Sequence, residues 1–561
     1  MMLREKLSKI LTFSIFLLIL IFSFYFNFES GRRGFFPLDQ SIIFDGSYRI
    51  LKGQIPYKDF LIPVGPVPFY LHSLFFKIFG VSYWSYLFGS SLINLLATIT
   101  SFFVIYIFFP SKNWLSFAGA TLTAIWFYPP SGTPYIEHTS FFLSLLGIFC
   151  LLIPLYGERI SKFSRGIFLF LSGFLALLSI LCKQNFGFFI LPIYFLLILS
   201  FHISNPKKIL PQSLFFSSGL ITGIFIFVAF VIKFSDLNLF LKYFFKLPFE
   251  TGLGRFLPKS FFFFLSRVGP LSILPFILLI FSASLFSIIL YICNFQKADD
   301  ELKRLFVSST LCSYLIISQY LFQLTTKNQP EMDLPFIGII FSIGAGILIY
   351  LTDLIKIKVH YKNSEAKIPS KIFIKRVLLF LFLIFGFYIA FKGVNISLTR
   401  KAHDIFNETV FKETLSVKEL KFLKWGEPTS IRGANVKREE IESLINFLKW
   451  ENKNFFIFPD FTILYGILNL PSPQPILWFH KGLTYPAHYD KSIDKWIVES
   501  LKKNDVKIIV IEEYSWFGTE ERLKDFPLLI SYIEKNFIGV NQIGIFSIYR
   551  FNGKVKKDMR H

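Results

Sequence analysis

The sequence predicts a mainly α-helical polytopic membrane protein with about eleven transmembrane helices and a C-terminal extracytoplasmic α/β domain. The first observation is composition, because 53% of the 561 residues are hydrophobic and 76 are phenylalanine. The second is the grouping of these residues into long apolar runs, which soluble domains of this size do not carry. The third is a shift after residue 392, where the long runs stop. We therefore divide the chain into a membrane core, 1–392, and a C-terminal domain, 393–561.

Eleven apolar runs are candidate membrane spans, although several are shorter than the ~20 residues that a span needs. The first run follows Arg4, Lys6 and Lys9 and has no small-residue cleavage site after it, so we expect a retained signal-anchor. The predicted spans are 10–29, 85–109, 114–128, 140–156, 166–181, 188–203, 213–232, 270–293, 305–322, 334–351 and 377–392.

The charges of the short loops predict the orientation. With the N-terminus in the cytoplasm, the second loop (129–139) has no Lys or Arg and the third loop (182–187) has only Lys183, whereas the cytoplasmic connections are basic. This asymmetry is the positive-inside pattern. An odd number of spans then puts the C-terminal domain outside, in a multi-pass protein of the cytoplasmic (inner) membrane. The cytoplasmic basic residues are Arg159, Lys162, Arg165, Lys207, Lys208, Lys303, Arg304 and those of a run over 356–376.

The formal net charge of +22 has a membrane interpretation. In a soluble protein this charge would indicate nucleic-acid binding. Here the lysines flank membrane spans, where they face anionic lipid head groups. We therefore expect membrane lipids, and no nucleic acid, among the partners.

The first loop, residues 30–84, is too polar to span a bilayer and too apolar for a plain connection. Its sequence predicts a helix over Asp39–Lys52 that ends at Gly53. A connecting segment rich in Pro and Gly follows this helix. One face of this helix is apolar, so we expect it to lie on the membrane surface. That face consists of Ile42, Ile43, Ile50 and Leu51.

Three charged residues of this helix have competing interpretations. Asp39 lies near the helix N-terminus, where it either caps the helix or takes part in chemistry at the membrane face. Asp45 and Arg49 are four residues apart, so an ordinary ion pair on the helix surface is the default for them.

The first loop also matches a known pattern. Asp39-Gln40, the run Arg49-Ile50-Leu51-Lys52-Gly53-Gln54-Ile55-Pro56-Tyr57-Lys58-Asp59-Phe60, and Gly65-Pro66 resemble the first outer loop of bacterial GT-C glycosyltransferases. This superfamily includes the family 39 protein mannosyltransferases and the lipid A aminoarabinose transferase. The resemblance covers the first loop closely and the remaining architecture loosely.

The resemblance implies an enzyme with a multi-span core and an active site at the outer face. Such enzymes take a hexose or pentose from a polyprenyl phosphate or pyrophosphate carrier and give it to a lipid, glycan or protein acceptor. The presumed catalytic base of the family matches Asp39. Gln40 departs from the usual Glu, and Arg49 and Tyr57, which belong to the matching run, become candidate substrate-binding residues.

The chemistry of the transfer is consistent with an Asp at this position. A carboxylate can take the proton of the acceptor hydroxyl or amine as the acceptor attacks the anomeric carbon. A single carboxylate suffices for an inverting reaction, because the leaving phosphate needs no proton. The leaving group does need a cationic partner or a metal.

The second loop ends in Glu137-His138, at the mouth of a predicted span. Both are candidate substrate-binding residues, since relatives have an acidic residue in this loop. The alternative is a polar pair that marks the membrane interface. A carboxylate next to an imidazole also makes Glu137 a candidate ligand of a divalent metal such as Mg²⁺ or Mn²⁺, although two ligands are a weak signal. No other cofactor is predicted.

Two basic residues are candidates for binding the donor phosphate. Lys183 is the only cation of the third loop, and the alternative for it is snorkelling at the membrane interface. Arg255 lies in a long loop, 233–269, that is both basic and aromatic. That composition suits a prenyl-phosphate head group, and it equally suits any lipid surface.

The C-terminal domain shows alternating helix and strand signals, which predict a small α/β domain that folds on its own. Helices are predicted at 437–450 and 493–503, and strands at 455–458, 506–511 and 545–551. No catalytic motif stands out there.

Two other functions remain open at this stage. One is a polysaccharide ligase or polymerase of similar architecture, and the other is a flippase or transporter of lipid-linked sugars without covalent chemistry. Transporters usually show inverted repeats and charges at the membrane midplane, neither of which we find in this sequence.

Overall fold

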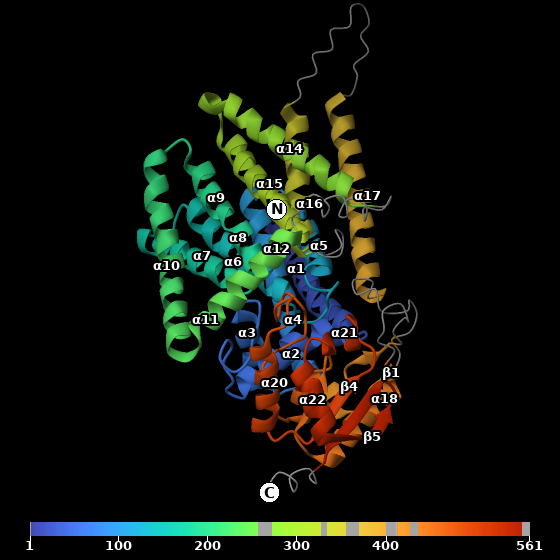
Figure 1. Cartoon of the computed structure of the whole chain (residues 1–561). Coiled ribbons are helices and arrows are strands. Elements are labelled where there is room, and N and C mark those ends of the chain that lie inside the picture. The colour runs from blue at the N-terminus through green and yellow to red at the C-terminus, as the bar shows by residue number, and fades with distance from the viewer. Residues whose placement is uncertain are drawn as a thin grey trace, which may run out of the picture.

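The computed structural model describes residues 2–255, 272–326, 334–354, 370–399, 411, 413–426 and 436–552, which form a helical bundle with an α/β domain at one end (Figure 1). The predicted basic residues at 356–369 and loop residues at 256–269 lie outside these ranges. Within them, nine stretches of helix are long and apolar enough to cross a membrane. The helices concerned are α1 (Met2–Gly31), α4 (Tyr83–Phe108), α6 (Ile136–Tyr156), α7 (Lys162–Ile180), α8 (Gln184–Ile190) with α9 (Pro192–His202), α10 (Ile209–Phe234), α14 (Leu274–Cys293), α15 (Asp300–Thr326) and α17 (Ser370–Thr399).

The two remaining predicted spans correspond to shorter helices, α5 (Asn113–Trp126) and α16 (Ile337–Leu354). They pack against each other, with α1 and α4 beside α5 and with α14 and α15 beside α16. A Cβ atom on Gly338 would lie 2.3 Å from the carbonyl oxygen of Gly119, so the two backbones touch. Small residues permit such contacts between helices in membranes.

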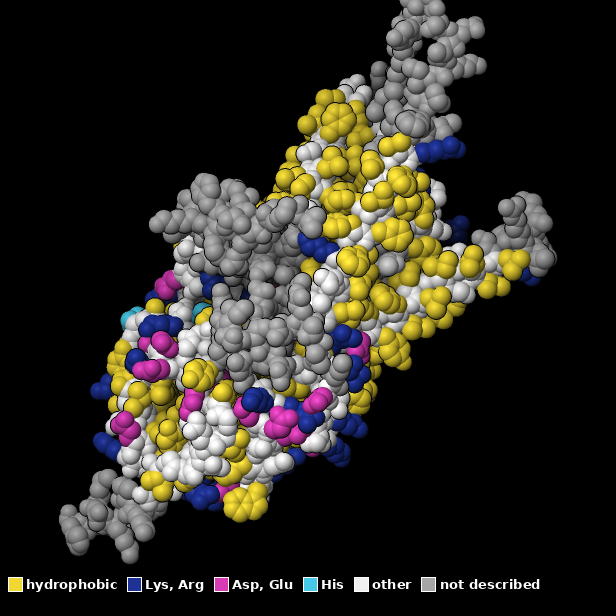
Figure 2. All heavy atoms as spheres, turned by 90° about the vertical axis from the view of Figure 1, so that its right-hand side faces the viewer, with side chains coloured by type: hydrophobic (Ala, Val, Ile, Leu, Met, Phe, Trp, Pro, Cys, Tyr) yellow, Lys and Arg dark blue, Asp and Glu magenta, His cyan; other side chains and the backbone are white. Residues whose placement is uncertain are grey.

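Side chains at the surface divide the molecule into an apolar and a charged part (Figure 2). Hydrophobic side chains cover the helical part, whereas Lys, Arg, Asp and Glu gather on the C-terminal domain. Large apolar residues such as Phe225 of α10, Phe286 of α14 and Phe387 of α17 are more than half exposed. Together with the apolar helices, this surface shows a multi-pass membrane protein.

The first loop folds into two helices, α2 (Pro37–Leu51) and α3 (Val67–Phe79). The predicted helix over 39–52 is confirmed as α2, within two residues at either end. Pro37 occupies its first turn, where the missing N–H is not needed. Gly53 follows the helix with φ +85°, a backbone conformation that favours glycine.

After the C-terminal end of α10, a bent helical segment runs back toward the centre of the molecule (Figure 1). It consists of α11 (Leu237–Phe240), a π-helical turn (Leu241–Lys246) and α12 (Leu247–Arg255). This segment brings Arg255 to the C-terminal end of α15, where its guanidinium donates to the carbonyl oxygens of Thr325 and Thr326, both at 3.4 Å.

The C-terminal domain contains a four-stranded sheet in the order β3-β4-β6-β5. The pair β3–β4 is parallel, with Phe456 opposite Ile509, and the other pairs are antiparallel. The strands are β3 (Phe455–Phe458), β4 (Ile508–Glu512), β5 (Phe537–Ile543) and β6 (Phe546–Phe551). The helices are α18 (Arg438–Glu451), α19 (Ile463–Leu468), α20 (Lys491–Lys503), α21 (Thr519–Leu523) and α22 (Pro527–Asn536), and β1 (Glu413–Thr414) and β2 (Lys424–Trp425) form a separate hairpin pair.

All five secondary-structure elements predicted for this domain are present. Strand β5 was not predicted, because it is exposed from Ile538 to Gln542 and therefore lacks an alternating apolar face.

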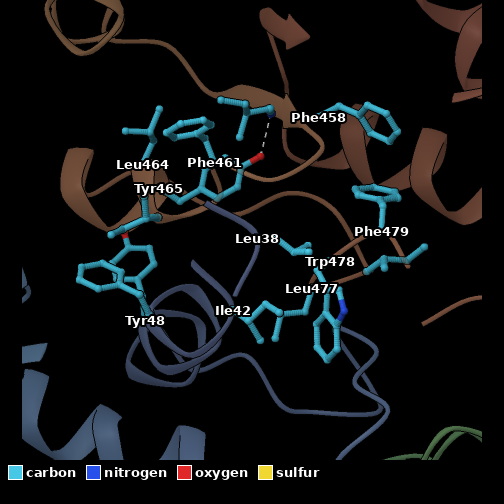
Figure 3. Close-up of a cluster of buried hydrophobic side chains, with 14 of the residues drawn as sticks. Leu38, Ile42, Tyr48, Phe458, Phe461, Leu464, Tyr465, Leu477, Trp478 and Phe479 are labelled. Carbon is cyan, nitrogen blue, oxygen red and sulfur yellow. Dashed lines mark hydrogen bonds between the residues drawn. The ribbon is translucent and has the colours of Figure 1, made fainter. Parts of the chain in front are cut away.

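Helix α2 lies between the bundle and the C-terminal domain, and it is buried on nearly every side. Leu38 and Ile42 belong to the same buried cluster as Phe461 and Leu477 (Figure 3). The expectation that α2 lies on the membrane surface is therefore wrong, because the C-terminal domain covers it. The C-terminal domain in turn shares its core with the first loop. We therefore expect the domain to need that loop and not to fold on its own.

The ion pair between Asp45 and Arg49 is also not a surface pair. Arg49 donates to the Asp45 carboxylate at 2.9 Å, and the two side chains are 1% and 0% exposed. Both reach into the C-terminal domain, because Arg49 donates to the carbonyl oxygen of Gln474 at 2.7 Å and Ser472 donates to Asp45 at 2.6 Å. This buried network ties α2 to the segment 470–477.

Candidate active site

Asp39 lies in the first turn of α2, at the junction of the bundle and the C-terminal domain. It does not cap the helix, because the N-cap is Phe36 and has no side-chain capping bond. Instead the Tyr135 hydroxyl donates to Asp39 Oδ2 at 3.1 Å. Tyr135 belongs to the second loop, and its proximity to Glu137 in the sequence is the only signal that could have pointed to it.

The surroundings of Asp39 raise its proton affinity. Burial raises the pKa of the Asp39 carboxyl to about 7, and the negative charges of Glu137 and Asp460 act in the same direction. The hydrogen bond from Tyr135 and the charge of Lys183 act against this rise in the pKa. A carboxyl group with this pKa is half ionised near neutral pH, which suits a general base.

Glu137 and Lys183 form an ion pair beside Asp39. Lys183 Nζ lies 2.8 Å from Glu137 Oε1, and the side chains are 19% and 16% exposed. Glu137 lies in the first turn of α6, and Lys183 directly precedes α8. The structure thus brings together three of the predicted site residues, from three separate loops.

The other predicted residues of this region lie elsewhere. The ring of His138 is buried and packs at 4.6 Å from Tyr128. Tyr57 is also buried, and its hydroxyl donates to the carbonyl oxygen of Val64. Arg49 is held in the buried network with Asp45. These contacts leave His138, Tyr57 and Arg49 out of the site that we assign.

Gln40, the departure from the family pattern, links two loops. Its Oε1 accepts from the backbone N–H of Phe36 at 2.6 Å, and its Nε2 donates to the Thr133 hydroxyl at 3.1 Å. The first contact satisfies one of the free N–H groups at the start of α2. In the second contact the Gln40 amide is the donor, whereas a glutamate at this position could only accept from the Thr133 hydroxyl.

Side chains from the membrane helices fix the second loop. Asn27 of α1 donates to the Gly132 carbonyl at 3.2 Å, and Asn94 of α4 accepts from the Tyr128 backbone N–H at 3.2 Å. Both asparagines are fully buried. Because buried polar groups hold their partners in place, Tyr135 and Glu137 are presented from a fixed loop.

The C-terminal domain contributes charged groups at the carboxyl ends of its parallel strands. Asp460 follows β3 and forms a bidentate pair with Arg522, at 2.8 and 2.9 Å. Glu512 ends β4 and accepts from the backbone N–H groups of Asp460 and Phe461 at 2.7 and 2.9 Å. Burial, together with the charge of Asp460, raises the pKa of Glu512 to about 8.

Arg255 approaches the same edge of the C-terminal domain. Burial lowers the pKa of His480, and the positive charges of Arg255 and Arg522 add to this effect. Asp460 and His480 were not predicted as site residues. Asp460 could have been found from its position two residues after a buried strand, since ligands of parallel sheets bind at that end.

The residues described do not fit a divalent metal at Glu137. Within the described ranges, no group of three or more His, Cys, Asp or Glu side chains could hold a metal ion. The Glu137 carboxylate is paired with Lys183, while the neighbouring His138 ring packs among aromatic rings.

Comparison of the sequence with known families and with curated proteins finds no match. Solved structures do resemble the fold. ArnT from Cupriavidus metallidurans, bound to undecaprenyl phosphate, superposes with a TM-score of 0.51 at 10% identity, over 98% of either chain. The oligosaccharyltransferase of Archaeoglobus fulgidus gives 0.48 at 11% identity, over 89% of this chain and 69% of that one. Both are GT-C glycosyltransferases. The ArnT superposition confirms the predicted GT-C-like fold.

Proposed function

We propose that this chain is an inverting glycosyltransferase, which moves a sugar from a polyprenyl-phosphate-linked donor to an acceptor at the outer face of the cytoplasmic membrane. The single observation that carries the proposal is the placement of Asp39, a partly buried carboxyl with a pKa of about 7 beside the Glu137–Lys183 pair. The GT-C fold supports a sugar transferase, and the undecaprenyl phosphate bound to ArnT supports a polyprenyl carrier.

The proposed reaction is a single displacement. The acceptor oxygen or nitrogen attacks the anomeric carbon while Asp39 takes its proton. The bond between the anomeric carbon and the phosphate oxygen breaks, and its electron pair stays on the leaving phosphate. Attack from the side opposite the leaving group inverts the anomeric configuration. Tyr135 orients the Asp39 carboxyl through its hydrogen bond.

Two cations are assigned to the donor phosphate. Lys183 lies beside Asp39, so a phosphate within its reach places the anomeric carbon near the base. Arg255 is the second assignment, because α12 carries it to the edge of the C-terminal domain that bears Asp460. Ionised donors of this kind stabilise the charge that develops on the leaving phosphate.

Replacing Asp39 by Asn tests the proposal. The amide keeps the size of the side chain and still accepts from Tyr135, but it cannot take a proton. We expect normal membrane insertion and a fall in sugar transfer of roughly 10²–10⁴-fold. The assay uses membranes and a panel of polyprenyl-phosphate-linked hexoses and pentoses.

Asp59→Asn is the matched control, because Asp59 is exposed in the same loop and its contact with the Ile55 N–H needs only an acceptor oxygen. Transfer by Asp39→Asn within about threefold of the wild type would exclude Asp39 as the base.

A further inference from the structure

Three aromatic side chains stand on the loop that follows β4, which we call the aromatic loop (513–518). Tyr514 and Phe517 are 59% and 43% exposed, and Trp516 is half-buried. The loop leaves the carboxyl end of a strand whose neighbour, β3, is parallel to it. In open α/β sheets, ligands bind outside the carboxyl ends of parallel strands.

The aromatic loop lies next to the turn of α2 that carries Asp39. The ring of Trp516 packs at 5.1 Å from that of Phe36, the N-cap of α2. The ring of Phe461, one residue after Asp460, lies 6.0 Å from that of Phe35. On its other flank, the ring of Phe517 lies 4.8 Å from that of His480. The loop therefore faces the same junction as the proposed base.

Hydrogen bonds fix the shape of the aromatic loop. The N–H of Gly518 donates to the carbonyl of Ser515 at 3.0 Å, and the Thr519 hydroxyl donates to the Ser515 hydroxyl at 2.8 Å. Arg522 donates to the Gly518 carbonyl at 3.2 Å, and its guanidinium lies 5.9 Å from the centre of the Phe517 ring. Arg522 is itself held by its two hydrogen bonds to Asp460. The aromatic loop is therefore ordered before a ligand binds, which lowers the entropic cost of binding.

We propose that the aromatic loop binds the sugar ring of the acceptor, with Phe517 as the stacking surface. The proposal rests on the proposed function and names its acceptor as a carbohydrate. The C–H face of a sugar ring is apolar and can lie flat on an aromatic ring, while the hydroxyls reach polar groups around it. A ring held there lies at the junction that also bears Asp39, to which one of its hydroxyls would give its proton.

The charges around the loop favour a carbohydrate over a lipid surface. The exposed carboxylates Glu513, Glu520 and Glu521 flank the three aromatic residues. Loops and helices that insert into anionic membranes carry Lys and Arg instead. A neutral sugar is compatible with these carboxylates.

Binding of simple sugars to the purified full-length protein tests the inference. The probes are the methyl glycosides of glucose, galactose, mannose and N-acetylglucosamine. Their binding is measured by saturation-transfer NMR in a detergent without a sugar head group. We expect binding of at least one glycoside by the wild type, at least about threefold weaker binding by Phe517→Leu, and retention by Phe517→Trp. The matched control is Trp450→Ala, because Trp450 is 77% exposed at the end of α18, away from the aromatic loop.

Undecaprenyl phosphate binding, measured by native mass spectrometry on the same samples, separates the two proposals. A wild type that binds undecaprenyl phosphate but no glycoside would overturn the inference and leave the proposed function standing. Glycoside binding by Phe517→Leu equal to that of the wild type would also overturn the inference. If the same variant instead bound lipid vesicles more weakly than the wild type, the aromatic loop would be assigned to the membrane surface. Failure to bind undecaprenyl phosphate counts against the proposed function itself.

Discussion

At the scale of single residues, the charges around Asp39 come in pairs, and no cation among the residues that the structure describes is bonded to its carboxyl. Lys183 is bonded to Glu137 and Arg522 to Asp460, so the nearest cations are held by other carboxylates. Glu137 and Asp460 thus act on Asp39 as negative charges, and burial adds to them. This arrangement keeps a carboxyl group basic enough to take a proton at neutral pH.

The first residue-scale prediction concerns pH. Because a general base must be ionised, kcat/KM of the wild type is expected to fall as the pH drops through about 7, the pKa of Asp39. Glu137→Gln removes one of the charges that raise this pKa, so the acid limb should move to lower pH. Glu158→Gln, at an exposed site between α6 and α7, should leave it in place. An acid limb that does not move in Glu137→Gln would contradict the charge argument.

The second residue-scale prediction concerns Lys183. If Lys183 binds the donor phosphate in the ground state, Lys183→Ala should raise KM for the donor about tenfold or more and lower kcat less. The measurement belongs at a pH well above 7, because the lost positive charge also raises the pKa of Asp39. Lys183→Arg is expected to keep most of the donor affinity. An unchanged KM would limit Lys183 to its ion pair with Glu137.

At the scale of elements, α2 links the two parts of the molecule. Its apolar side chains enter the core of the C-terminal domain, and Asp45 and Arg49 bond to Ser472 and Gln474. Leu61, further along the first loop, also donates its N–H to the carbonyl of Pro475 at 2.6 Å. The position of Asp39 is therefore set by the C-terminal domain as well as by the bundle.

The prediction at this scale is the cost of breaking the buried pair. Asp45→Asn leaves the Arg49 charge buried without its carboxylate, which typically destabilises a protein by about 3–5 kcal/mol. Thermal unfolding of the purified variant should therefore begin well below that of the wild type. The exposed Asp59→Asn should stay within about 0.5 kcal/mol. Equal unfolding temperatures for wild type and Asp45→Asn would show that the C-terminal domain does not depend on this pair.

At the scale of the whole molecule, the basic connections and the C-terminal domain lie at opposite ends. The turns between α9 and α10 and between α14 and α15 are at the end of the bundle away from the C-terminal domain (Figure 1). Lys207 and Lys208 belong to the first of these turns, and Lys303 and Arg304 lie at the start of α15, directly after the second. The arrangement agrees with the positive-inside pattern, which predicts that the C-terminal domain lies outside the cytoplasm.

Cysteine labelling checks this orientation. In a Cys293→Ser background, which removes the exposed native cysteine of the described residues, a membrane-impermeant maleimide should label Lys503→Cys in intact cells. Lys207→Cys should react only after the membrane is opened. Both positions are exposed in the structure. If Lys207→Cys were labelled in intact cells and Lys503→Cys only after the membrane is opened, the C-terminal domain would be cytoplasmic. That result would contradict a reaction at the outer face of the membrane.

The sequence by itself determined the membrane class, two helices and three strands of the C-terminal domain, and Asp39 with Glu137 and Lys183 as site candidates. The membrane class and the secondary structure follow from local signals, namely apolar runs and strand and helix periodicity. The site candidates follow from polar residues at loop positions together with the resemblance to the GT-C first loop. The tertiary structure decided which polar residues meet. Asp45 and Arg49 have the spacing of a surface pair, and only the packing of the C-terminal domain onto α2 buries them. Tyr135, from the second loop, and the aromatic loop, from the C-terminal domain, also come near Asp39 only through tertiary contacts. Contacts between residues distant in the chain leave no periodic signal in the sequence.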